Sequence, residues 1–236
     1  MATISVTLLA PPAAAQSLSK FAAWDALMLT PVGALPAIER GDAGELSPGW
    51  GFAGRYGRWR YDSDDAIHND AGFSASHALA GRVDVSLTGA FLSLSCGTCP
   101  GWVSGGLQAR LPLLQRRLGA VGDDPVTGSI GFRGDVGVAH YLGEGGSNAR
   151  SISGTAALSL AIPTPLGGRL AVTVLPGIGG GRVVSVDETA QDTLPIIGAT
   201  VAWIFRAGLA VHAGIQRIVI DGGPSQLGVG LSWAGR

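Results

Sequence analysis

The sequence predicts an all-β protein, a closed antiparallel β-barrel that crosses a membrane with about ten strands. Three observations lead to this fold class. The 236 residues are 46% apolar and only 14% charged, and the mean hydropathy is +0.33, so much apolar surface must be kept from water. After residue 15 no apolar run is long enough for a transmembrane helix. The 38 glycines and 13 prolines separate short stretches of alternating apolar and polar residues, which is typical of strands joined by turns.

The first residues predict export. Residues 1–15 read MATISVTLLAPPAAA, a short apolar stretch that ends in the small residues of a signal-peptide cleavage site. We expect this segment to be removed from the mature protein.

Residues 16–46 fit no strand comfortably. Pro31 and Pro36 interrupt them, and proline cannot donate to a strand ladder. Phe21, Trp24 and Leu27 stand near helical spacing, with Met28 beside them. The pattern favours a short helix, at the periplasmic rim of the barrel or plugging its lumen, and two further strands are the alternative.

The barrel domain is expected to span residues 47–236, with eight or twelve strands as alternatives to ten. In one of the clearest strands, Val83, Val85 and Leu87 alternate with polar residues. In residues 150–162, apolar side chains oppose small hydroxyls, which suit a wetted lumen wall. The ten expected strands are 51–61, 71–79, 82–94, 101–111, 128–141, 150–162, 168–176, 193–205, 207–218 and 226–234.

The connections between these strands alternate in length, as short turns and long loops do at the two ends of an outer-membrane barrel. The short ones fall at residues 80–81, 163–167 and 206, and the longer ones at residues 62–70, 95–100, 143–148, 177–192 and 221–225. One connection breaks the rule, because residues 112–126 fall on the short side and are long. They form either an extended strand pair or an excursion that carries Arg116 and Arg117.

The chain ends in QLGVGLSW followed by three residues. Gln226, Gly228, Leu231 and Trp233 stand as polar-x-Gly-x-x-apolar-x-aromatic, which resembles the C-terminal signal that the barrel-assembly machinery recognises in outer-membrane proteins of Gram-negative bacteria. The resemblance implies an outer-membrane location, contact with membrane lipids, and recognition of these four residues by the assembly machinery. It indicates no subfamily. The ring of Trp233 would lie in the periplasmic aromatic girdle.

The only cysteines, Cys96 and Cys99, occur in SCGTCPGW on a predicted connection. Their spacing favours a local disulfide in an oxidising compartment. Free thiols are the first alternative. Redox or zinc chemistry is less favoured, because nothing here resembles the βαβ context of a redox pair and no nearby Cys or His completes a zinc site.

An acidic segment, DSDDAIHND, falls on the first long connection. A solvated loop is the favoured interpretation, because local charge runs usually lie in water. A divalent-cation site through hard oxygen ligands and an Asp–His pair for general base catalysis are the alternatives, the latter by comparison with the omptin surface proteases. The candidate residues are Asp62, Asp64, Asp65, His68 and Asp70.

Polar and charged residues on the face opposite the apolar ladder are expected to form a network in the lumen. Barrels of about eight strands have lumens just wide enough for side chains to fill, so a slightly larger one should be narrow. Buried arginines and aspartates can then pair across it. The expected members are Arg58, Arg60, Asp84, Gln108, Arg110, Arg133, Asp135, Arg169, His212 and Gln216.

The net charge of −1, without an extended basic run, argues against nucleic-acid binding. We expect an outer-membrane barrel of structural or surface type with a narrow polar lumen, with no cofactor, no metal and no enzymatic activity. The alternatives are a small porin-like channel, an omptin-like surface enzyme and a soluble lipid-binding barrel. The orientation of Leu87, Leu158 and Val172, outward or inward, distinguishes a membrane barrel from a soluble one.

Overall fold

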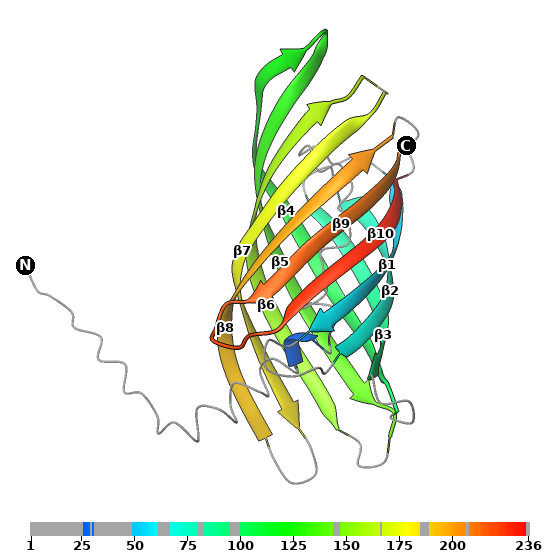
Figure 1. Ribbon diagram of the computed structural model, residues 1–236, viewed down its shortest axis with the longest axis vertical. Coiled ribbons are helices and arrows are strands. Elements are labelled where there is room, and N and C mark those ends of the chain that lie inside the picture. Colours follow the sequence, from blue (N-terminus) through cyan, green and yellow to red (C-terminus); the bar gives the residue numbers. More distant parts are fainter. Residues whose placement is uncertain are drawn as a thin grey trace, which may run out of the picture.

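Ten antiparallel strands close into one barrel in the computed structural model (Figure 1). The structure describes residues 26–28, 30, 49–60, 67–79, 83–94, 100–143, 147–165, 167–184, 189–205 and 208–234. Among these residues no helix is long and apolar enough to span a membrane. The strands are β1 (Trp50–Arg60), β2 (Ile67–Leu79), β3 (Val83–Leu94), β4 (Trp102–Val121), β5 (Asp124–Tyr141), β6 (Asn148–Pro163), β7 (Arg169–Val184), β8 (Thr189–Ile204), β9 (Leu209–Ile218) and β10 (Ser225–Ala234).

Each strand pairs with its neighbours in the chain, and β1 pairs with β10 to close the barrel. The predicted fold class and strand number are therefore confirmed. The barrel has two distinct ends. We call the turn end the one that holds the start of β1, the end of β10 and the β2–β3, β4–β5, β6–β7 and β8–β9 connections, and the loop end the opposite one.

Two of the long connections expected from the sequence are mostly strand. The expected long connection at residues 177–192 is mostly strand, because β7 and β8 stay paired to Val184 and Thr189. Residues 112–126 form an extended strand pair, in which β4 and β5 continue to a tight turn at Gly122 and Asp123. The sequence left this alternative open, and strand pairing decides it.

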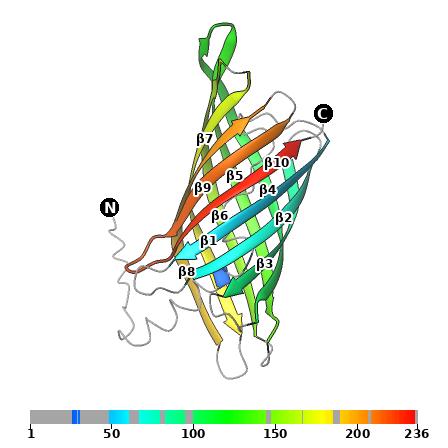
Figure 2. The ribbon, with the colours of Figure 1, turned by 45° about the vertical axis from the view of Figure 1, so that its right-hand side comes forward.

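The extended β4–β5 hairpin projects past the turn end of the barrel (Figures 1 and 2). Pairing between β3 and β4 stops at Asp84 and Arg110, so beyond this point β4 is paired only with β5. Register shifts after Pro112 and Arg117 interrupt the hairpin ladder. Such bulges twist and protect an exposed edge.

Apolar side chains point outward. Leu87, Leu158 and Val172 are 61%, 45% and 37% exposed, whereas their neighbours Ser159 and Thr173 are buried inside the barrel. A soluble lipid-binding barrel needs the reverse arrangement, so that alternative is wrong. In water, the outer face would leave a very large apolar surface exposed.

Aromatic side chains gather on the outer face at the turn end. Trp50 begins β1, Trp203 stands near the end of β8, and Trp233 near the end of β10. The rings of Phe52 and Trp233 stack across the β1–β10 pair with centroids 6.3 Å apart. Amphipathic rings at the edge of an apolar belt are typical of a membrane interface.

Candidate functional site

The lumen wall carries most of the polar residues that the alternation assigned to it. The half-buried Arg169 shares the inner face of β7 with buried Ala171 and Thr173. The other inward residues are buried: Asp84, Gln108, Arg110, Arg133, Asp135, His212 and Gln216.

The predicted lumen position of Arg58 and Arg60 is wrong, because both side chains are exposed on the outer face of β1. The alternation runs in the opposite phase, so that Gly57 and Trp59 point inward and are buried. Arg55 is the inward arginine of this strand, and the prediction missed it. The large aromatic residues Phe52 and Tyr56 are an even number of residues from Arg58, so they lie on the same face of β1 and point outward. This pattern could have indicated that Arg55 is the inward arginine.

The first lumen group is centred on Asp135 of β5. Arg133 donates to its carboxylate from Nε at 3.0 Å and from Nη2 at 2.9 Å. Gln108 of β4 donates from Nε2 at 2.8 Å, and Ser153 of β6 donates from Oγ at 3.2 Å. Both carboxylate oxygens are thus satisfied by charge-assisted bonds from three strands, which offsets the cost of burying the charge.

The second lumen group is centred on Asp70 of β2. Arg55 Nη2 lies 3.4 Å from Asp70 Oδ2, and Gln226 Nε2 donates to Oδ1 at 2.7 Å. Asp70 and Gln226 reach each other across β1, where Gly57 is the register partner of Asp70. A Cβ atom at Gly57 would collide with both side chains, so glycine is required for this close approach.

Little space remains beside these groups. A hollow of about 10 Å³ adjoins Asp70, Arg55 and His212, and another of about 10 Å³ adjoins Asp135 and Arg133. A volume of this size holds about one water molecule. Each of these two hollows therefore has room for a single water molecule rather than for a substrate.

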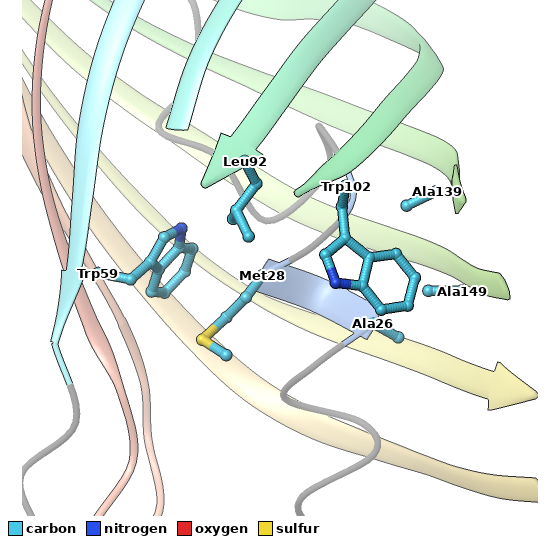
Figure 3. Close-up of a cluster of buried hydrophobic side chains, with 7 residues drawn as sticks. All are labelled: Ala26, Met28, Trp59, Leu92, Trp102, Ala139 and Ala149. Carbon is cyan, nitrogen blue, oxygen red and sulfur yellow. The ribbon is translucent and has the colours of Figure 1, made fainter. Parts of the chain in front are cut away.

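One turn of helix from the N-terminal region lies inside the barrel at the loop end. Ala26 and Met28 pack against Trp59 and Trp102, and Figure 3 shows the helical turn lying among these side chains. The remaining members of this cluster are Leu92, Ala139 and Ala149. These residues come from five different strands, so the helical turn contacts much of the barrel circumference.

Leu27 and Thr30 connect the helical turn to β6, β8 and β9. Leu27 is buried against Leu194, Ile196 and Ile218 of β8 and β9. Thr30 Oγ1 donates to the Ala26 carbonyl at 2.8 Å and is hydrogen-bonded to Ser151 of β6. The sequence predicted a short helix in this region, and the structure places it in the lumen near the loop end rather than at the turn end.

The acidic segment is only partly described. Asp62, Asp64 and Asp65 lie outside the described residues. His68 is half-buried in β2, and Asp70 belongs to the lumen wall instead of a loop, because β2 begins at Ile67. Among the described residues, no group of three or more His, Cys, Asp or Glu side chains is placed to hold a metal ion.

The predicted disulfide and the C-terminal pattern have different outcomes in the structure. Cys96 and Cys99 lie outside the described residues. In the C-terminal pattern, Gln226 is buried in the lumen, whereas Leu231 and Trp233 are 55% and 46% exposed on the outer face.

Comparisons with known proteins concern the fold. No protein-family model matches the chain, and no curated protein matches it in sequence. Similar solved structures include the β-domain of the Bordetella autotransporter BrkA (12% identity, 80% of this chain and 100% of that chain, TM-score 0.42). They also include the N-terminal β-barrel domain of Pseudomonas aeruginosa OprF (13%, 78% and 96%, 0.33) and Ail of Yersinia pestis (12%, 79% and 99%, 0.34). The strand pairing of this chain itself defines the closed antiparallel β-barrel, and these matches indicate no subfamily.

Proposed function

We propose that this chain is an integral outer-membrane protein whose closed barrel serves as a membrane-embedded scaffold for its loops rather than as an open pore. The outward-facing apolar side chains carry the membrane part of this proposal. Strands β1, β9 and β10 have 11, 10 and 10 residues, which matches the roughly 9–11 residues that a tilted strand needs to cross a bilayer.

The difference between the two ends of the barrel supports one orientation in the membrane. The turn end would face the periplasm, because it has the shorter connections and holds both ends of the barrel domain. The signal-like residues 1–15 and the C-terminal pattern, including Leu231 and Trp233, are consistent with export and recognition by the barrel-assembly machinery. The loop end would then lie at the cell surface.

Two features at different heights in the barrel support a closed lumen. Within the wall, the Asp135 group links β4, β5 and β6 and leaves only a water-sized hollow. At the loop end, the turn Ala26–Met28 is buried between the two sides of the barrel. Opening a pore would require breaking buried charge pairs and also exposing buried apolar side chains.

Planar-bilayer recording tests this proposal. The full-length protein, folded in detergent and inserted into the bilayer, should give no steady current. Insertion is verified on the same sample, by resistance of the barrel to added protease in vesicles. Steady conductance of the wild-type protein would reject the closed lumen in favour of the porin-like alternative, and failure to insert would reject membrane residence itself.

A further inference from the structure

Five arginines point outward from the barrel wall, and all of them lie at its loop end. They are the exposed residues Arg58, Arg60, Arg150, Arg182 and Arg217. The other described arginines lie on the inner face or on the projecting hairpin. Those on the inner face are Arg55, Arg110, Arg133 and Arg169, and those on the hairpin are Arg116 and Arg117. In the part of the wall that the structure describes, outward positive charge is therefore confined to one end.

The arginines form two groups, one on β6 and β7 and one on either side of β10. Arg150 of β6 and Arg182 of β7 are direct register partners. Arg60 of β1 and Arg217 of β9 both pair with Ser225 of β10, so they flank one residue from either side. Arg58 lies two residues before Arg60 on the same face.

Like charges that stand directly opposite each other on a sheet are destabilising. Among the described residues, no carboxylate lies on the outer face of β6 and β7 beside Arg150 and Arg182. Asp192 shares the inner face of β8 with buried Leu194, and Asp221 belongs to the β9–β10 connection. An external anion that binds between paired arginines would remove the repulsion, and guanidinium groups match phosphate oxygens in bidentate geometry.

The surroundings of Arg150 and Arg182 fit a lipid. A hollow of about 420 Å³ lies on this part of the surface, and both arginines line it. Its other lining residues are Val138, Ala139, Asn148, Ala149 and Val184. Directly along β6 from Arg150, Ile152 is 63% exposed on the lipid-facing surface. A positive edge above an apolar wall suits a molecule that has a phosphate headgroup and acyl chains.

We propose that Arg150 and Arg182, on the outer face at the loop end, bind phosphate groups of lipids in the adjacent membrane leaflet. This inference rests on the proposed outer-membrane location, in which the loop-side leaflet is the outer one. The contacts would fix the depth of the barrel in the membrane, because the arginines hold one rim at the headgroup level while the aromatic rings hold the other.

Lipid binding by the folded full-length protein in detergent micelles tests the proposal. The probes are diphosphorylated lipid A, the same lipid without its phosphates, and inorganic phosphate. The double variant R150Q/R182Q should bind diphosphorylated lipid A at least about tenfold more weakly than the wild type, because the loss of even one charge-assisted contact gives that factor. The matched control R116Q/R117Q, on the hairpin at the other end, should bind like the wild type.

Each other outcome overturns the inference. Equal weakening in both double variants would show a nonspecific charge effect. Equal binding of the dephosphorylated lipid would remove the role of phosphate, and displacement of the lipid by millimolar inorganic phosphate would point to free phosphate as the ligand. Insertion of both double variants into vesicles is scored separately, so that loss of lipid preference with intact insertion leaves the proposed function standing.

Discussion

Gln226 of the last strand donates a 2.7 Å hydrogen bond to Asp70 of the second strand, 156 residues earlier in the chain. The bond crosses β1 above Gly57 and lies beside the β1–β10 pair that closes the barrel. Arg55 provides the compensating charge for Asp70. Three strands at the seam are thus joined by side chains in addition to their backbone ladders.

Gly57→Val should weaken this seam. The new side chain would collide with Asp70 and Gln226, and overpacking of this kind costs about 1–3 kcal/mol of unfolding free energy. Urea unfolding of the protein in lipid vesicles measures the change. Gly54→Val is the matched control, because a Cβ atom at Gly54 of the same strand meets nothing within 4 Å. Equal destabilisation by both variants would contradict the role of the contact above Gly57.

Asp135→Ala should be among the most destabilising substitutions in the lumen. It removes the acceptor of Arg133, Gln108 and Ser153 and leaves a buried guanidinium without its counter-charge. Loss of one partner of a buried ion pair costs roughly 3–5 kcal/mol. The unfolding midpoint is compared with that of Asp123→Ala on the exposed hairpin turn. A midpoint that moves no more than in this control would argue against the buried pair.

Leu158→Arg tests the depth and orientation of the outer face. Leu158 stands near the middle of β6 and points outward, so an arginine there should cost about 2–4 kcal/mol at the bilayer midplane. Leu118 of the projecting hairpin is 64% exposed and lies beyond the turn end, so Leu118→Arg should have little effect. Refolding titrations into vesicles measure the loss of unfolding free energy in the two variants. A larger loss in Leu118→Arg than in Leu158→Arg would contradict the assigned position of the barrel in the membrane.

Gly179→Leu should displace the helical turn from the lumen. A Cβ atom at this buried inward position lies only 2.7 Å from Leu27 Cδ2, so a larger side chain occupies the place of Leu27. Release of Met28 from Trp59 and Trp102 should then change the tryptophan emission of the folded protein. The control is Gly119→Leu, on the hairpin, where a Cβ atom meets nothing within 4 Å. Unchanged emission in Gly179→Leu would show that the turn does not depend on this space.

The alternation of apolar and polar residues was enough to predict the fold class, the ten strands and the inward position of Asp84, Gln108 and Asp135. The physical reason is that successive side chains on a strand point to opposite faces, so a consistent alternation reports which face meets lipid. The signal was ambiguous where arginines and aromatics both recur, as in the segment RYGRWRY, residues 55–61. There the phase was wrong, and Arg55 was missed in favour of Arg58 and Arg60.

The contacts between these residues could not be predicted in the same way, because they depend on how the strands come together. The contact of Asp70 with Gln226 depends on the closure of the barrel and on the missing side chain of Gly57, neither of which is a local property of the chain. The buried position of the Leu27 side chain depends likewise on the space at Gly179, more than 150 residues away in sequence, and on apolar residues from two other strands. Alternation within one strand predicts which face each of its side chains occupies. Which side chains contact each other inside the lumen depends on the register of the strands and on the space that neighbouring strands leave.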